Sequence, residues 1–277
     1  MPPVMPPVIR EAFAEAGAAR QSGQLDVAVQ ALERALEQLR TTPLGVPFMA
    51  RVQLALVLAD TYLDAGQREQ ARSLLLAESG YAEQITRLMG VSGTPEQRRA
   101  ASAGRMQLRD RAAQVALLHG PAPDLDVADW VLGDATSLAE LRGQVVLLEF
   151  WATWCRPCLE MFPRLNALHE RFAARGLTIL ALTRYGQMPP DADQDATLAA
   201  HRQERDLVQT VIAERGLQVR VGIAPDGRTQ QRYGAAGVPT LVLIDRAGTV
   251  KLIASGGDDE ALDGAIASCL DEPADER

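Results

Sequence analysis

Apolar residues recur at helical spacing through the first 119 residues, and no alternating strand pattern interrupts them. One stripe consists of Leu25, Val29, Leu32, Leu36 and Leu39. Such a stripe is typical of a helix that buries one face. A last helix is expected to begin at Thr94, whose hydroxyl can cap it while Gln97 caps reciprocally. The pattern predicts an all-helical domain over residues 1–119.

Two segments of this helical half carry small residues at the same spacing. The recurring residues are Ala16, Gly23 and Ala28 in the first segment and Ala59, Gly66 and Ala71 in the second. The spacing resembles the tetratricopeptide helix-turn-helix repeat, whose usual period is about 34 residues. The signature tryptophan, second glycine and terminal proline of that repeat are missing, so an ordinary helical bundle is an equal alternative.

The pattern changes after the segment 121–124, where Pro121 and Pro123 force extended backbone. From there, apolar β-rich runs alternate with helical spacing, which predicts an α/β domain over residues 120–277. The expected strands lie at 145–151, 177–183, 217–221, 240–245 and 249–254, and the expected helices follow the first strand to about residue 175 and cover 195–215 and 260–270.

The charge balance narrows the possible partners. With 28 basic and 36 acidic residues the formal net charge is −8, which argues against general affinity for nucleic acid or anionic lipid. No apolar run approaches the roughly 18 residues that cross a bilayer, so no integral membrane segment is expected. The first ten residues carry prolines where a secretory signal would be apolar. Taken alone, the sequence therefore predicts a cytoplasmic protein.

Candidate chemistry lies in the cysteines. Cys155 and Cys158 enclose Arg156 and Pro157 at the expected start of a helix, while Cys269 stands alone and is expected to be an inert buried thiol. The helix start favours a thiolate at Cys155, which makes it the attacking thiol and Cys158 the resolving thiol.

The residues beside the cysteine pair would tune it, and other uses of the pair remain open. Arg156 would lower the thiol pKa further and Pro157 would stiffen the turn. The alternatives are a zinc half-site, for which the remaining ligands would be Cys269 and three histidines, or two plain buried cysteines. Apart from the redox-active disulfide, no cofactor or metal is expected.

The segment 150–158, Phe-Trp-Ala-Thr-Trp-Cys-Arg-Pro-Cys, resembles the active-site segment of the TlpA/ResA branch of the thioredoxin superfamily. The resemblance continues in residues 122–124, 138–143, 233–234, 237–240 and 244–248, and covers the chain from about Pro121 onward. It implies an α/β thioredoxin fold, with a central mixed sheet flanked by helices, preceded here by an all-α domain of helical hairpins.

The resemblance also implies roles for individual residues. Pro239 would be a cis-proline facing the disulfide, and the backbone of Val238 would pair with an extended client segment. Glu149 matches the buried acid that transfers protons in thioredoxins, although pairing with a basic side chain is the alternative. Trp151 and Trp154 would shape the client groove, although packing is the alternative use of tryptophans beside such a turn. The expected client-binding residues are Trp154, Arg156, Pro157, Val238 and Pro239.

The expected function is thus thiol–disulfide exchange. Pro157 is similar to the reductant motifs, which favours reduction of client protein disulfides, with electrons from an upstream donor that the sequence does not identify. A peroxiredoxin is disfavoured because the Pro-x-x-x-Thr-x-x-Cys pattern is missing. The rival is an interaction protein whose helical half docks partners and whose second domain is a scaffold. Proteins that resemble this branch usually work outside the cytoplasm, which implies a periplasmic location.

Overall fold

The computed structural model describes residues 5–41, 47–186, 193–254 and 259–272. The chain divides into a helical unit, Met1–Ala116, and an α/β unit, Leu117–Arg277. The division lies close to the predicted boundary after residue 119. None of the described helices has the length and apolar character that a membrane span requires.

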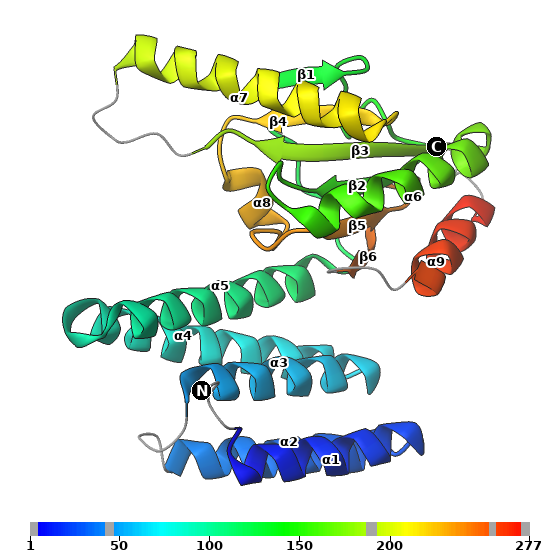
Figure 1. Ribbon diagram of the computed structural model, residues 1–277. Coiled ribbons are helices and arrows are strands. Elements are labelled where there is room, and N and C mark those ends of the chain that lie inside the picture. Colours follow the sequence, from blue (N-terminus) through cyan, green and yellow to red (C-terminus); the bar gives the residue numbers. More distant parts are fainter. Residues whose placement is uncertain (1–4, 42–46, 187–192, 255–258, 273–277) are drawn as a thin grey trace. The chain divides into compact units, whose positions relative to one another are not determined.

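The described part of the helical unit consists of helices, as predicted (Figure 1). They are α1 (Pro7–Gln21), α2 (Leu25–Thr41), α3 (Phe48–Asp64), α4 (Arg68–Ser92) and α5 (Pro95–Leu117). The stripe on α2 faces inward, because Val29, Leu32, Leu36 and Leu39 are all buried in one apolar core with residues of α1, α3 and α4.

Helices α1 and α2 form one hairpin and α3 and α4 form a second with the same turn. Gly23 and Gly66 both adopt positive φ angles, 70° and 72°, which glycine reaches at no steric cost. The Gln24 N–H donates to the Ala19 carbonyl at 2.8 Å, and the Gln67 N–H donates to the Tyr62 carbonyl at 2.7 Å. The small residues at matched positions, Ala16 and Ala59 and then Ala28 and Ala71, are all buried. The two segments are therefore structurally equivalent hairpins; their membership of the tetratricopeptide family stays a prediction.

The N-terminus of α5 is the capping box that the sequence indicates. The Gln97 N–H donates to the Thr94 hydroxyl at 3.2 Å, and the Thr94 N–H donates to the Gln97 side-chain oxygen at 2.8 Å. Pro95 occupies the first helical position, where its missing N–H costs nothing.

The α/β unit has a mixed sheet in the order β1-β4-β3-β2-β5-β6. Its strands are β1 (Asp129–Leu132), β2 (Val145–Phe150), β3 (Leu177–Arg184), β4 (Arg220–Ala224), β5 (Thr240–Ile244) and β6 (Val250–Ala254). Strands β2, β3 and β4 are parallel, whereas β5 runs antiparallel to β2 and β1 runs antiparallel to β4. Strand β2 is paired on both sides, which places its C-terminal end at the centre of the sheet.

Helices flank this sheet (Figure 1). They are α6 (Arg156–Phe172), continued by the 3-10 turn Ala173–Arg175, then α7 (Gln194–Arg215), α8 (Arg228–Arg232) and α9 (Asp259–Asp271). Apolar residues of α6, α7 and α9 share one core with alternate residues of β2, and Tyr233, just after α8, lies in a second core. This arrangement confirms the predicted thioredoxin fold.

Three elements differ from the sequence-based expectation. The strand expected at 217–221 is wrong in position: β4 begins at Arg220, because the Leu217 N–H still closes the turn after α7 on the Ile212 carbonyl. Strand β1 and helix α8 were not predicted. Each is only four or five residues long, too short for a periodic signal.

Candidate active site

Cys155 lies at the start of a helix, just after the central strand β2 ends. Strand β2 ends at Phe150, a short turn follows, and Cys155 is the N-cap residue of α6. Its sulfur accepts a hydrogen bond from the Cys158 N–H at 3.3 Å. Backbone N–H groups are free at a helix start and the helix dipole is positive there, so a negative charge on the Cys155 sulfur is stabilised.

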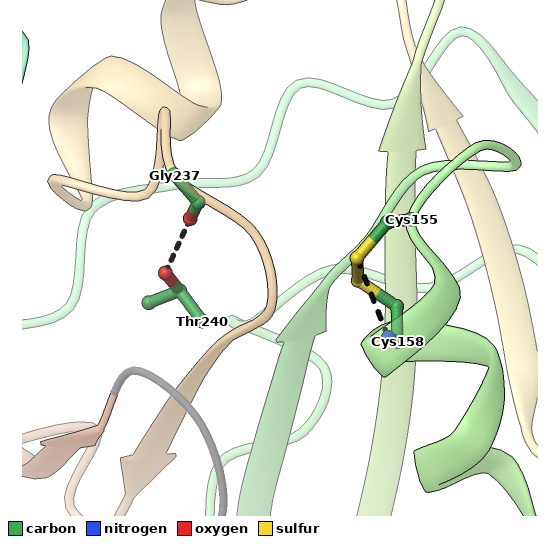
Figure 2. The surroundings of a disulfide bond; sticks show 4 residues. All are labelled: Cys155, Cys158, Gly237 and Thr240. Atoms are coloured by element: carbon green, nitrogen blue, oxygen red, sulfur yellow. Dashed lines mark hydrogen bonds between the residues drawn. A yellow bond between two sulfur atoms is a disulfide. The ribbon is translucent and has the colours of Figure 1, made fainter. Parts of the chain in front are cut away.

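Cys155 and Cys158 form a disulfide (Figure 2). Cys155 is 4% exposed and Cys158 is fully buried, so an approaching thiol or disulfide meets Cys155 first. Because each sulfur is bonded to the other, neither is available as a zinc ligand in this oxidised form. No cluster of three or more potential ligand residues occurs in the part of the chain that the structure describes.

Arg156 sits beside the disulfide but points into solvent. Its side chain is 87% exposed, and its Nε donates to Glu160 at 2.7 Å, one helical turn further on. The neighbouring carboxylate offsets the positive charge, and water screens what is left. A lowering of the Cys155 thiol pKa by Arg156 stays a prediction, and the structure limits it to a small effect.

The loop before β5 lies opposite the disulfide (Figure 2). The Thr240 hydroxyl donates to the Gly237 carbonyl at 2.7 Å, which closes this loop on itself. Within it the Val238–Pro239 peptide bond is cis, the isomer that the family resemblance implies. Val238 is half-buried and packs against the core that contains Cys155 and Cys158. The structure thus brings the cysteine pair and the proline loop together.

Glu149 occupies the fifth position of β2 and is fully buried. Successive side chains of a strand alternate between faces, so Glu149 shares a face with Leu147 and Trp151, which belong to the core around the two cysteines. Neither of its carboxyl oxygens has a hydrogen-bond partner among the described residues. Desolvation by this burial raises the pKa of Glu149 to about 8. Pairing with a basic side chain is therefore wrong within the described part of the chain.

A groove opens next to the disulfide. Its walls come from the turn 151–154, the residues 183–186 at the end of β3, Gln230 of α8 and Val238 beside the cis-proline. Trp154 stands at its rim with 80% of its surface exposed, whereas Trp151 is buried and packs edge-on against Phe162 at 5.1 Å. Trp154 therefore fits the predicted role in the groove directly, while Trp151 belongs mainly to the core.

Several parts of this groove were not predicted from the sequence, and they include residues 183–186, Gln230, and Glu204 and Val208 of α7. Residues 183–186 follow from a general rule, because the C-terminal ends of parallel strands β2 and β3 meet at one edge of the sheet. Gln230 carried no such signal, since it lies on a helix too short to predict.

Cys269 lies in α9 and is buried as a free thiol. Its burial raises the pKa of the thiol. A buried, largely protonated thiol is a poor nucleophile, which agrees with the inert role that the sequence suggested.

The match to a known protein family lies in the α/β unit. Residues 118–253 match the model of the AhpC/TSA family. The thiol-disulfide oxidoreductase ResA of Bacillus thuringiensis (strain Al Hakam) is 33% identical over 130 residues, which are 47% of this chain and 64% of that protein. ResA of Geobacillus thermodenitrificans (strain NG80-2) is 32% identical over 136 residues, 49% of this chain and 67% of that protein.

A solved structure is also similar to part of this chain. The thiol-disulfide isomerase of Corynebacterium glutamicum is 24% identical, covers 55% of this chain and 98% of its own length, and aligns with a TM-score of 0.45. The chain thus spans about two thirds of the length of the ResA proteins that it matches.

Proposed function

Because the chain belongs to the ResA-like branch of the thioredoxin superfamily, we propose that it is a thiol–disulfide oxidoreductase that reduces disulfides of client proteins through Cys155 and Cys158. The observation that carries the proposal is the disulfide at the N-terminus of α6, with its outer sulfur stabilised by the helix start. The neighbouring cis-proline loop and the groove supply a place for an extended client segment.

The reaction begins from the reduced protein. The Cys155 thiolate attacks one sulfur of the client disulfide, a Cys155–client S–S bond forms, and the other client sulfur leaves as a thiolate and takes up a proton. Cys158 then loses its proton and attacks the Cys155 sulfur, which re-forms the internal disulfide and releases the second client thiolate. Two electrons have passed to the client. An upstream dithiol donor of two electrons must return the protein to its reduced form.

We propose that Glu149 handles the proton of Cys158. Both side chains are fully buried, and Glu149 shares its face of β2 with Leu147 and Trp151, which belong to the same core as Cys158. A carboxyl group with a pKa near 8 can accept and release a proton close to neutral pH, which an ordinary glutamate cannot do. We assign Glu149 the role of proton acceptor in client reduction and of proton donor when the reaction runs in reverse.

The redox potential of the Cys155/Cys158 couple tests the activity and its direction. The oxidised protein is equilibrated against glutathione or dithiothreitol and the transition is followed by tryptophan fluorescence, because Trp154 adjoins Cys155 and is exposed. A potential near the value of thioredoxin, about −270 mV, supports a reductase, whereas one near −120 mV identifies an oxidant. Cys155→Ser is the control. Absence of a reversible two-electron transition would overturn the proposal.

Because residues 118–253 match the AhpC/TSA family, peroxidase activity should be measured as well. Leu148 and Ala152 stand where the peroxiredoxin pattern has its proline and threonine before the cysteine, so we expect no turnover of hydrogen peroxide. Turnover that is lost in Cys155→Ser would assign the protein to the peroxidases instead.

The helical unit and the compartment complete the proposal. We propose that the paired hairpins dock a client or the upstream donor. The test is to substitute residues of the groove between α2, α3 and α4 and to measure the affinity for that partner. An affinity that these substitutions leave unchanged would contradict the proposal. We also propose a periplasmic location, which the resemblance to the TlpA/ResA branch supports and which cell fractionation tests.

A further inference from the structure

Arg184 brings an unpaired positive charge to the wall of the active-site groove. It is the last residue of β3, it is exposed to solvent, and it lines the groove together with Trp154 and Val238. Within the part of the chain that the structure describes, its guanidinium group has no hydrogen bond or ion pair. The charge is therefore available to a molecule that binds in the groove.

The backbone at Arg184 is fixed relative to the active turn. The Trp151 N–H, at the start of that turn, donates to the Leu182 carbonyl at 3.0 Å. On the other side of β3, the Tyr185 N–H donates to the Ala224 carbonyl at 2.9 Å. The side chain of Arg184 therefore starts from a rigid strand end, and only its own torsions adjust the guanidinium group to a client.

Three other arginines near the groove already have acidic partners. The pairs are Arg156 with Glu160 at 2.7 Å, Arg228 with Asp226 at 2.7 Å, and Arg205 with Asp129 at 3.6 Å. Glu204, an acidic residue of the groove wall, is also engaged, because its carboxylate accepts from the Gly186 N–H at 2.8 Å. A client in the groove thus meets Arg184 as a cation that no described carboxylate neutralises.

We infer that Arg184 selects client segments that carry an aspartate or glutamate close to the attacked cysteine. This rests on the proposed reductase function and adds the class of client that the groove favours. The client carboxylate accepts hydrogen bonds from the guanidinium group while Cys155 attacks the client disulfide. The ion pair takes no part in the exchange of bonds and acts on client binding alone.

The overall charge of the protein acts in the opposite direction. The formal net charge is −8, which repels an acidic segment. A preference for acidic clients therefore requires a local positive charge. Because a solvent-exposed ion pair is weak, we expect the preference to be about threefold and to shrink as salt screens it.

The test uses synthetic peptides with one internal disulfide, in which Asp, Asn or Lys is placed at one position at a time near the attacked cysteine. The full-length reduced protein is mixed with each peptide, and the second-order rate constant of reduction is followed by tryptophan fluorescence. We expect the Asp peptide to react about threefold faster than the Asn peptide for at least one position at low salt. The Asp/Asn ratio should approach one in about 1 M NaCl.

Four variants separate recognition by charge from a structural effect. Arg184→Gln should bring the Asp/Asn ratio to about one, and Arg184→Lys should retain part of the preference. Arg184→Glu should reverse it, so that the Lys peptide reacts faster than the Asp peptide. Arg202→Gln is the matched control and should keep the ratio of the wild type, because Arg202 is exposed on α7 but does not line the groove.

An Asp/Asn ratio of one or below for the wild type at every position would overturn the inference, as would a ratio that Arg184→Gln leaves unchanged. Failure of the wild type to reduce any of the peptides, or insulin, would instead overturn the proposed function itself.

Discussion

Glu78 of the helical unit and Glu149 of the α/β unit are both buried, but only one has a counter-charge. Arg51 donates two hydrogen bonds to Glu78, at 2.7 and 3.0 Å, and Arg40 adds a third contact at 3.5 Å. The Arg51 guanidinium also lies over the ring of Tyr81, 3.7 Å from its centroid. Glu149 has no such partner among the described residues.

The presence or absence of a basic partner decides what a buried carboxyl group can do. A buried glutamate that is clamped by an arginine holds two helices together, since removal of either partner leaves an isolated buried charge. A buried glutamate without a partner becomes a weak acid that changes its protonation near neutral pH. The same residue type therefore forms an ion pair in one unit, whereas in the other it is buried without a partner, as the proposed proton transfer requires.

The largest expected effect concerns the pH dependence of stability. Because the pKa of Glu149 is raised from 4.5 to about 8 in the folded state, the unfolded chain releases this proton at lower pH than the folded chain does. Stability from this group is fully present below pH 4.5 and is lost as the pH rises to 8, by about 5 kcal/mol in total.

This loss can be measured in the α/β unit alone, because Trp130, Trp151 and Trp154, the three tryptophans of the chain, all lie there. Urea unfolding of the oxidised protein is followed by tryptophan fluorescence at pH values from 5 to 8. The free energy of unfolding should decline over this range in the wild type but not in Glu149→Gln. If the free energy of unfolding changes with pH in the same way in both proteins, the raised pKa of Glu149 is contradicted.

Loss of the ion pair in the helical unit should come next in size. Glu78→Leu leaves Arg51 buried and unpaired, and should destabilise that unit by about 3–5 kcal/mol. Far-UV circular dichroism during urea unfolding should report the loss, while tryptophan fluorescence should not move. The double variant Glu78→Leu/Arg51→Met is the control and should recover most of the stability; a single-variant loss below about 1 kcal/mol would show that the pair is not structural.

Removal of the Glu149 carboxyl should slow catalysis. We expect Glu149→Gln to reduce the rate at which Cys158 resolves the mixed disulfide by about a hundredfold at pH 7, the typical size of a general acid–base contribution. Stopped-flow fluorescence with a disulfide peptide measures this step. Glu149→Asp, which keeps a carboxyl group, should recover part of the rate. A Gln variant within about threefold of the wild type would assign Glu149 no role in proton transfer.

The smallest effect is expected for the exposed pair beside the disulfide. Glu160→Gln releases Arg156 from its hydrogen bond, yet both side chains are in water. The rate at which iodoacetamide alkylates Cys155 in the reduced protein should change by less than about twofold at pH 7. A much larger change would mean that Arg156 controls the thiolate directly.

Sequence reasoning went furthest where a local pattern settles the local structure. The apolar run 145–151 followed by Cys155 and Cys158 indicated a strand, an active turn and a helix, and Thr94 with Gln97 indicated the start of α5. It failed where long-range contacts decide. The position of β4, the existence of β1 and the place of Gln230 in the groove depend on pairing and packing with distant segments.

Glu149 shows the same limit at the scale of one side chain. Its place in an apolar strand was evident, but whether it meets a basic partner could be decided only from the three-dimensional structure.

The most direct test of the account is the titration of the Glu149 carboxyl group itself. Infrared difference spectra of the oxidised protein against Glu149→Gln isolate the C=O stretch of one protonated carboxylic acid. We expect this band to be present at pH 6 and to disappear with a midpoint near pH 8. A band that is already lost by pH 5.5 would show that Glu149 is an ordinary ionised glutamate, and would contradict its role in proton transfer.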